Sequence, residues 1–292
     1  MRDALKDEAW FERWVRYDIE RIAQMQDKLR TPAANRAYEP QYAFELATGI
    51  LESMLRRYSR GDAVAELGAL FAPLLDAWET AERLGAGVWT EEQQQRRHAW
   101  SLNLDHYVQS FWLVGLALAL ERPDAEWQRL LRLVGNEGED VLLDRVIASR
   151  QPGRRIGTTL CHPQPYRSLL DAVDAAPAAQ PKLLRAFVER WYTGLDRPPK
   201  KGLSPQTALY ERPYWHRYDS VDGAYFGYWC VEAVAAVKAF GIDDGACLGL
   251  PHYPGDLLRA GGASTHPPRA ASAPPPGASG GLLGRVRRLL AS

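Results

Sequence analysis

Apolar residues recur every three or four positions along most of this chain, a spacing that places them on one face of a helix. The clearest case spans residues 3–29, where charged residues lie opposite the apolar face. That apolar face carries Phe11, Trp14, Val15, Ile19, Ile22, Met25 and Leu29. The same spacing predicts helices over 40–58, 63–84, 91–121, 124–133, 139–148, 166–175 and 182–195. No segment shows the sustained alternation of a β-strand, so the sequence predicts an all-α fold of packed antiparallel helices in one elongated body.

One further segment, Tyr225–Phe240, is apolar on almost every face, and only Glu232 and Lys238 in it carry charge. A helix of this kind must lie inside the protein. A buried charge on Glu232 costs several kcal/mol unless it has a partner. We therefore expect an internal ion pair, with Arg212, Arg217 or His216 as the candidates. The alternative is a surface groove into which Glu232 points.

Aromatic and acidic side chains crowd both flanks of this apolar segment. Before it come Tyr214, Trp215, Tyr218, Asp219 and Asp222, and after it come Asp243, Asp244, Tyr253 and Asp256. Rigid aromatic side chains among carboxylates suit a surface that grips a basic partner. They do not by themselves form a catalytic site.

The length of 292 residues allows one large domain or two small ones. We predict an N-terminal helical domain over 1–121, a C-terminal one over 122–258, and a tail over 259–292. The three cysteines, Cys161, Cys230 and Cys247, are too scattered for a disulfide framework, which favours a reducing compartment. The charged N-terminus shows no signal peptide, and the longest apolar run, 111–120, is short of the roughly 18 residues that span a bilayer. The sequence thus predicts a cytoplasmic protein.

The formal net charge of zero hides an uneven distribution. Five of the 36 basic residues follow Leu258, where there is no acid, so residues 1–258 carry 31 basic against 36 acidic side chains. A net charge of −5 is within the ordinary range for solubility. It nevertheless disfavours nucleic acid as a partner and favours basic partners.

The tail differs in composition from the rest of the chain. Residues 261–281 are almost entirely Gly, Ala, Ser and Pro, which predicts a flexible, disordered linker. Residues 282–290 place leucines and a valine on one helical face and three arginines opposite, a pattern typical of contact with a membrane surface or a partner groove. Nine residues are marginal as an isolated helix, so a weakly structured tail is the other interpretation.

Motifs for catalysis are absent: the sequence has no phosphate-binding loop, dinucleotide fingerprint, nucleophile elbow or H-E-x-x-H zinc motif. Asp105 and His106 are adjacent but lack a nucleophile, which favours an inward polar contact. The best metal candidate combines Asp243, Asp244, His252 and Asp256, with Glu232 upstream. Adjacent aspartates usually cap a turn and diverge, so we expect no metal and no cofactor.

The segment from Tyr225 to Leu258 resembles the C-terminal domain of PoNi-type immunity proteins, which protect bacteria against polymorphic nuclease effectors of type VI and related secretion systems. That family shows a Y-x-G-Y-W-x-x-E-A-A helix, a G-[IL]-D-D turn and a Y-Y-P-x-D-L ending. The helix motif is matched by Tyr225, Gly227, Tyr228, Trp229, Glu232 and Ala233. The turn and the ending are matched by Gly241, Ile242, Asp243, Asp244, Tyr253, Pro254, Asp256 and Leu257.

The resemblance extends upstream and covers roughly residues 5–258. Trp191 and Tyr192 resemble the W-Y segment before the family's helix, and the stretch LESMLRRYSRGDAVAELGALFAPLLDAWE resembles its N-terminal companion domain. The chain departs from the family pattern at His252 and Gly255, where aromatic residues are common. It also has RPPKKGLSPQTALYERPYW in place of the usual tryptophan-containing stretch.

The resemblance implies a stoichiometric inhibitor, without turnover, of a cognate nuclease toxin. Carboxylates would then mimic DNA phosphates toward the basic face of a DNase. On this reading the charge contacts are Asp219, Asp222, Asp243, Asp244 and Asp256, and the anchors are Tyr214, Trp215, Tyr218 and Tyr253. Two alternatives remain: a helical adaptor or scaffold protein, and a metal-dependent enzyme.

Overall fold

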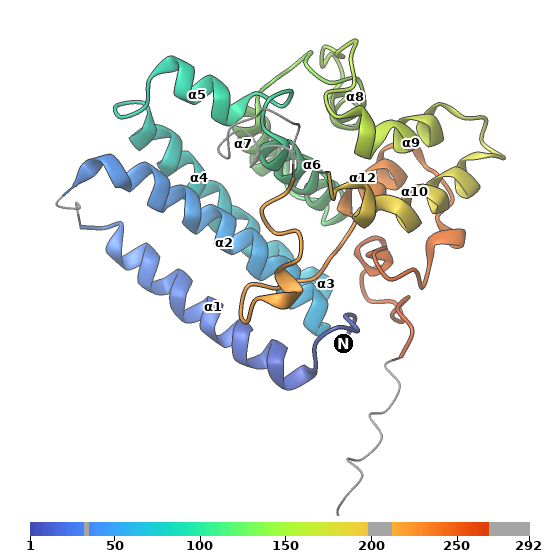
Figure 1. Cartoon of the computed structure of the whole chain (residues 1–292), viewed down its shortest axis with the longest axis horizontal. Helices are drawn as coiled ribbons and strands as arrows, with labels where there is room; N and C mark the ends of the chain where they lie inside the picture. The colour runs from blue at the N-terminus through green and yellow to red at the C-terminus, as the bar shows by residue number, and fades with distance from the viewer. Residues whose placement is uncertain (32–34, 198–211, 269–292) are drawn as a thin grey trace, which may run out of the picture.

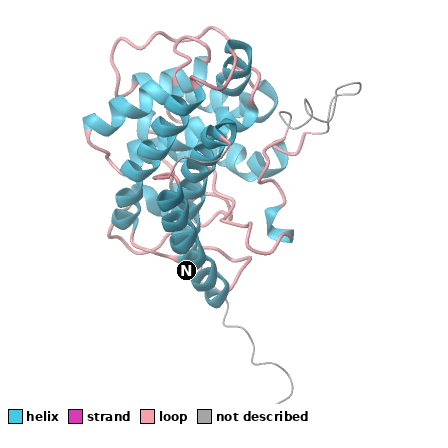
Figure 2. Cartoon of the chain, turned by 90° about the vertical axis from the view of Figure 1, so that its left-hand side faces the viewer, coloured by secondary structure: helices cyan, strands magenta, loops and turns pink. Residues whose placement is uncertain are grey.

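The computed structural model describes residues 1–31, 35–197 and 212–268. Within these ranges the chain forms helices joined by loops, and it contains no strand (Figure 2). The all-α prediction is therefore confirmed. None of the helices in the described ranges is long and apolar enough to cross a membrane.

The N-terminal part is built on three long helices that run side by side, α1 (Glu8–Lys28), α2 (Glu39–Arg60) and α4 (Phe71–Gly85) (Figure 1). Asp7 caps α1 by accepting a hydrogen bond from the Trp10 amide at 2.8 Å. Gly61 ends α2 with a φ of 108°, a left-handed conformation that suits glycine. The predicted helix over 63–84 begins with short turns, α3 (Val64–Leu67) and η2 (Gly68–Leu70), before α4. A short turn, η1 (Arg36–Tyr38), precedes α2.

The single helix predicted over 91–121 is wrong, because the structure divides it into α5 (Glu91–His98) and α6 (Leu104–Ala119). Thr90 and Gln93 form a capping box that starts the polar α5. Asn103 then caps α6 by accepting a hydrogen bond from the His106 amide at 3.1 Å. The chain turns at the four residues before this cap, so the exposed polar α5 and the buried α6 follow different directions (Figure 1).

The C-terminal part contains the apolar α12 (Val231–Phe240), which packs on α6, and further helices, of which some pack on α12 and others on neighbouring helices. These are α7 (Asp124–Val134), α8 (Val141–Ala148), α9 (Pro163–Asp174) and α10 (Gln180–Gly194), with the turns η4 (Tyr218–Ser220), η5 (Gly245–Cys247) and η6 (Gly255–Leu258). α12 lies against α6 so closely that a β-carbon on Gly115 would stand 3.0 Å from that of Ala235. One continuous core therefore joins the N-terminal and C-terminal parts.

The helix predicted from Tyr225 begins only at Val231, and Tyr225–Cys230 is a buried non-helical segment. Gly227 explains the difference. Its φ of 103° is outside the helical region, and a β-carbon there would meet Ser59 Oγ and Trp229 Nε1 at 2.2 Å. The segment thus enters the core as irregular chain, and its backbone groups bond to side chains of α2.

Both ends of the described chain pack on the end of α2. The amides of Arg2 and Asp3 donate to the Ser59 carbonyl at 2.9 and 3.1 Å. His266, predicted to lie in the flexible linker, is buried against Tyr58, and its Nε2 lies 2.8 Å from the Tyr58 hydroxyl. The packed part of the chain thus continues past residue 258. The linker from 269 to 281, the segment 282–290 and residues 198–211 lie outside the described residues.

Candidate functional site

Glu232 is fully buried in the first turn of α12, and it is held by neutral hydrogen-bond donors. Its Oε1 accepts hydrogen bonds from the Tyr166 hydroxyl at 2.8 Å and from Trp191 Nε1 at 3.1 Å. Burial raises the pKa of the Glu232 carboxyl, and the two hydrogen bonds oppose that rise only in part. The carboxyl is therefore held by neutral donors and forms no ion pair with a described residue.

The expected pairing of Glu232 with a basic side chain is wrong. Arg212 and Arg217 both form ion pairs with Asp196, at 2.8 and 2.6 Å. His216 instead stacks on Tyr192, with ring centroids 4.2 Å apart, and its Nε2 lies 3.1 Å from the Tyr192 carbonyl oxygen. Arg212 and Arg217 lie nearer the surface, where their charges stay hydrated, whereas His216 is buried and burial lowers its pKa.

The aromatic residues of the helix motif, Tyr225, Tyr228 and Trp229, are core side chains with polar partners. Each of them is at most 5 % exposed. Tyr225 donates to Asp3 Oδ2, Tyr228 donates to Asp219 Oδ1 at 2.6 Å, and Trp229 donates to Ser59 Oγ at 2.7 Å. The motif thus joins the C-terminal part to the N-terminal segment and to α2.

Three of the predicted toxin contacts, Asp219, Asp222 and Asp243, are exposed. Asp219 and Asp222 lie on the loop around η4, beside α1, where Asp222 accepts hydrogen bonds from Trp10 Nε1 at 3.1 Å and from Arg13 at 3.3 Å. Asp243 lies in a separate place, on the turn before η5, which packs against α10. The exposed carboxylates therefore form a pair and a single residue instead of one cluster.

Four other predicted contacts are buried: Trp215, Asp244, Tyr253 and Asp256. Asp244 accepts a hydrogen bond from the Tyr253 hydroxyl at 2.6 Å and pairs with Arg259 at 2.5 Å. Burial alone would raise the pKa of this carboxyl, but Arg259 and Tyr253 hold it below its usual value. In this conformation these side chains support the surface loops, and a role in toxin contact is indirect.

The acidic residues considered for a metal are each engaged elsewhere. Asp244 binds Arg259, Asp256 binds Arg2 at 2.6 Å, and His252 Nδ1 lies 2.9 Å from the Tyr228 carbonyl oxygen. In the described part of the chain, no group of three or more His, Cys, Asp or Glu side chains converges as metal ligands would. The geometry thus does not gather the proposed ligand set.

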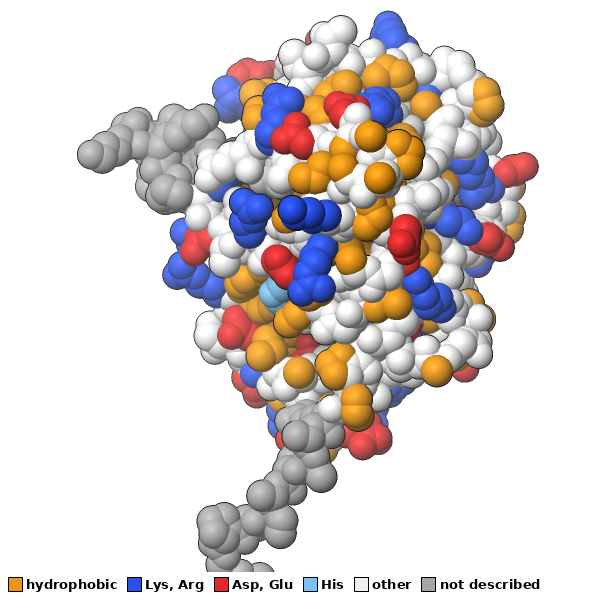
Figure 3. All heavy atoms as spheres, turned by 90° about the vertical axis from the view of Figure 1, so that its right-hand side faces the viewer, with side chains coloured by type: hydrophobic (Ala, Val, Ile, Leu, Met, Phe, Trp, Pro, Cys, Tyr) orange, Lys and Arg blue, Asp and Glu red, His pale blue; other side chains and the backbone are white. Residues whose placement is uncertain are grey.

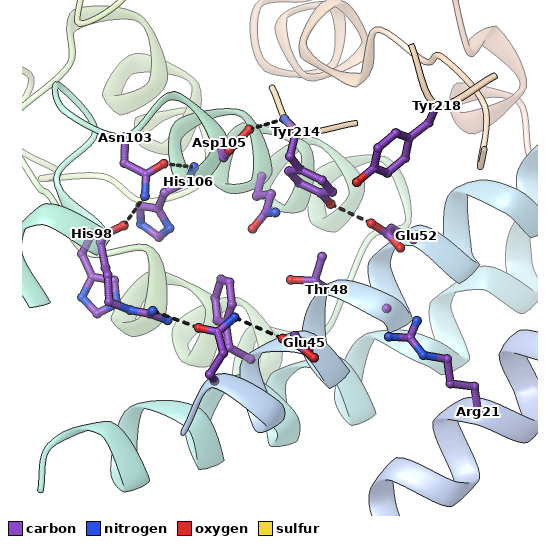
Figure 4. A pocket seen from close by; sticks show the side chains of 15 residues that line it. Arg21, Glu45, Thr48, Glu52, His98, Asn103, Asp105, His106, Tyr214 and Tyr218 are labelled. Carbon is purple, nitrogen blue, oxygen red and sulfur yellow. Dashed lines mark hydrogen bonds between the residues drawn. The ribbon is translucent and has the colours of Figure 1, made fainter. Parts of the chain in front are cut away.

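A pocket of about 510 Å³ lies between α2, the start of α6 and the loop that carries Tyr214 and Tyr218 (Figure 4). The Tyr214 amide donates to Asp105 Oδ1 at 2.9 Å, and the Tyr214 hydroxyl donates to Glu52 Oε1 at 2.8 Å. Tyr214 therefore links a carboxylate of α6 to one of α2. We refer to this concavity as the Tyr214 pocket.

The acid groups of the Tyr214 pocket have shifted pKa values. Burial raises the pKa of Glu52 to about 7 against the opposing hydrogen bond from Tyr214, and burial raises that of Asp105 to about 7 as well. Burial also lowers the pKa of His106, which is 3 % exposed, to about 3, and the nearby charges of His98 and Arg97 act in the same direction. The His106 side chain points inward, as expected, and packs edge to face on Trp78.

Sequence reasoning identified Tyr214 and Tyr218 but not the pocket that they line. Its other walls come from Arg21 on α1 and from residues between 41 and 109, including Glu52 and Asp105. The nearest signal was the pair of polar residues Asp105 and His106 at the start of an otherwise apolar helix. Nothing in the sequence brings that helix end to α2 and to the loop at 214–218.

Comparison with known proteins gives the fold and the family. Residues 2–132 match the sequence model of the PoNe immunity protein (PoNi) N-terminal region, and residues 138–257 match that of the C-terminal region. No curated protein matches the chain. The crystal structure of protein PA2201 from Pseudomonas aeruginosa is similar, with a TM-score of 0.65 and 21 % sequence identity over 89 % of this chain and 90 % of that one.

The two matched regions follow one another in the family's order and together span most of the chain. Their C-terminal region includes the buried motif around Trp229 and Glu232, and their N-terminal region includes the α2 residues on which that motif packs. The chain therefore belongs to the PoNe immunity protein (PoNi) family, and this membership implies that it neutralises a polymorphic nuclease toxin.

Proposed function

We propose that the protein neutralises a DNase-type toxin of a type VI or related secretion system by stoichiometric occlusion, without turnover. The observation that carries this proposal is the match of both halves of the chain to the PoNi family. A nuclease presents lysines and arginines to DNA phosphates, so its working face is basic. The excess of acidic side chains over residues 1–258 favours association with such a face.

Within this proposal the main contact surface is the loop around η4 together with the Tyr214 pocket beside it. Asp219 and Asp222 are exposed there, and Tyr214 and Tyr218 are partly exposed aromatic side chains on the same loop. Carboxylates at the rim speed association, and partly buried aromatics slow dissociation. Asp243 is then an outlying contact, and Trp215, Asp244, Tyr253 and Asp256 support the loops from below.

The face that includes α9 and α10 fits less well. Figure 3 shows basic, acidic and apolar side chains intermixed on it, with several basic side chains gathered near its centre. Arg167 and Arg190 line a shallow pocket between these two helices. Such a mixed face offers the basic surface of a nuclease less attraction than the exposed carboxylates of the η4 loop do.

The test is co-expression of the full chain with the C-terminal domain of a toxin encoded beside it, scored by survival, co-purification and nuclease activity. We expect rescue and a stable stoichiometric complex without nuclease activity. Asp219→Asn with Asp222→Asn should slow association about tenfold or more at low salt and less at high salt. The matched control, Glu20→Gln with Asp171→Asn, changes the same charge at two exposed acids away from the η4 loop.

Two results would contradict the proposal. Failure of the wild-type chain to protect cells or to bind the toxin refutes the inhibitory function. Equal association rates for the η4-loop variant and the control refute the placement of the contact surface only. Competition with a DNA duplex then separates the modes of inhibition, because active-site occlusion excludes DNA from the complex and exosite binding does not.

A further inference from the structure

The Tyr214 pocket holds acidic groups that form no ion pair with a described residue, although the charges of Arg56 and Arg21 act on Glu52 from a distance. Glu45, Glu52 and Asp105 line it, and none of them forms an ion pair with a described residue. Their hydrogen bonds come from neutral donors: the Tyr214 hydroxyl and amide, and Gln41 Nε2 at 3.5 Å from Glu45. A cation that entered the pocket would thus find unused carboxylate oxygens.

The walls of the pocket also suit a cation with an apolar stem. Tyr214 and Tyr218 face each other edge to face, with ring centroids 5.8 Å apart, and Phe44 lines the opposite side. Aromatic faces attract ammonium and guanidinium groups, more strongly where water is excluded. The volume of about 510 Å³ is within the range of pockets that enclose a ligand.

A second, independent observation lies at the base of the pocket. His106 is 3 % exposed, and its Nε2 has no hydrogen-bond partner among the described residues. Figure 4 shows its ring between Asn103 and His98, at the end of the pocket away from Arg21. A buried polar atom without a partner is costly, and it is common where a ligand completes a site.

In the described part of the chain, neither of the two arginines that line the pocket forms an ion pair with its carboxylates. Arg97 donates to Gln41 Oε1 at 3.1 Å and stacks on the ring of Trp89 at 3.7 Å, so it is already held at the far end. Arg21 lies at the mouth on α1, where its Nη1 stands over Gly49 (Figure 4). Its charge lowers the pKa of Glu52, and that effect is weaker than the opposing effect of burial.

We propose that the Tyr214 pocket receives an arginine or lysine side chain of the cognate toxin, held between Glu52 and Asp105 with Tyr214 and Tyr218 against its stem. This inference rests on the proposed function. It adds a defined anchor, because a basic side chain taken from the face of a nuclease is removed from contact with DNA. Arg21 competes with the incoming charge and lowers its affinity.

The experiment compares the affinity of the toxin domain for four full-length chains: wild type, Glu52→Gln with Asp105→Asn, Arg21→Gln, and the control Glu20→Gln with Asp171→Asn. We expect the pocket variant to lose about 30-fold or more, as truncation of one partner of a buried charge pair does. Arg21→Gln should bind more tightly than wild type, and the control should equal wild type.

A second readout uses agmatine, a small guanidinium compound, in place of the toxin. Agmatine should raise the Tm of the wild type and of Arg21→Gln at pH 8, and it should leave the Tm of the pocket variant unchanged. If the pocket variant is not folded by circular dichroism, Thr48→Arg replaces it. This substitution places a resident guanidinium on the pocket wall and should weaken toxin binding in the same way.

The outcomes separate this inference from the function on which it rests. Tight toxin binding by wild type, with equal binding by the pocket variant, overturns the pocket proposal and leaves the inhibitory function intact. The pocket proposal is also overturned if agmatine binds to the wild type but the pocket variant keeps full affinity for the toxin. The pocket would then be a site for a small cation and not for a toxin side chain. Absence of toxin binding by wild type refutes the function and the inference with it.

Discussion

Arg2 Nε donates to Asp256 Oδ2 at 2.6 Å, a contact between residues 254 positions apart in the sequence. The Arg2 and Asp256 side chains are 10 % and 5 % exposed, so water screens this pair only weakly. Arg2 also donates to the carbonyls of Tyr58 and Asp62, at 3.0 and 2.8 Å. The start of the chain, the end of α2 and the η6 turn are thereby joined at one point.

Replacement of Arg2 by Met should destabilise the protein by about 3 kcal/mol, because Asp256 would remain buried without its cation. For a chain of this size that loss lowers Tm by roughly 6–12 °C. The exposed pair Arg13 and Asp222 provides the control, since Arg13→Met should change Tm by less than about 2 °C. Thermal unfolding followed by circular dichroism at pH 7 measures both, and equal shifts would contradict this prediction.

The same pair gives a prediction for acid. Burial would raise the pKa of Asp256, but hydrogen bonds from Arg2, Thr265 and Ser264 lower it to about 2, below the ordinary value of an aspartate. A lowered pKa stabilises the folded state above pH 4, and this stabilisation is lost as the pH falls toward 2. The difference in Tm between wild type and Asp256→Asn should therefore narrow over that interval. A constant difference would contradict the assignment.

Two acids of the Tyr214 pocket have the opposite effect: they lower the stability of the fold as the pH rises. Glu52 and Asp105 titrate near pH 7 in the folded state and near pH 4 in the unfolded chain, so their burial costs stability increasingly between pH 4 and 7. Glu52→Gln with Asp105→Asn should match wild type at pH 4 and exceed its Tm by several degrees at pH 8. A Tm of the variant below that of wild type at pH 8 would contradict this prediction.

Substitutions of Glu232 test whether this buried carboxyl is neutral in the folded protein. Gln at this position retains an oxygen that can accept from Tyr166 and Trp191, so Glu232→Gln should change stability by less than about 1 kcal/mol. Glu232→Leu removes the acceptor and should cost about 2–4 kcal/mol, since two buried donors lose their partner. Denaturant unfolding compares the two variants. A large loss in Glu232→Gln would show that the group is charged.

Gly227 is predicted to be intolerant of any side chain. Gly227→Ala combines a φ of 103° with a β-carbon 2.2 Å from Ser59 Oγ, and it should cost more than about 3 kcal/mol. Gly241→Ala is the matched control, because Gly241 also has a positive φ, 67°, but no atom lies within 4 Å of the added carbon. It should cost about 1 kcal/mol. Similar losses in both would show that backbone conformation alone sets the cost.

The helices that the sequence predicts well are those whose signal is local. Apolar spacing located α1 and α2 within a few residues of their ends, apart from the first turn predicted for α1. The break before α6 was missed because Asn103 reads as one more polar residue, although its capping position three residues before His106 is a recognisable signal. The delayed start of α12 depends on Gly227, whose φ is set by distant contacts with Ser59 and Trp229.

The candidate site could be predicted only in part for the same reason. The aromatic and acidic composition of the loop at 214–222 is visible in the sequence, but the exposure of each residue is not. Asp219 and Asp256 look alike in the sequence, yet one is exposed and the other is 4 % exposed. Only basic side chains were considered as partners for Glu232 in the sequence. Its actual donors are neutral and lie 66 and 41 residues away.

The bonds of Tyr214 have a consequence for how the protein matures. Its amide and hydroxyl bond to Asp105 and Glu52, which lie 109 and 162 positions earlier in the chain. The pocket therefore exists only when the loop at 214–218 is docked on α2 and α6. A chain whose synthesis has stopped before this loop has no such site and would not occupy the toxin. On this view, toxin binding requires a chain that extends at least through Tyr218.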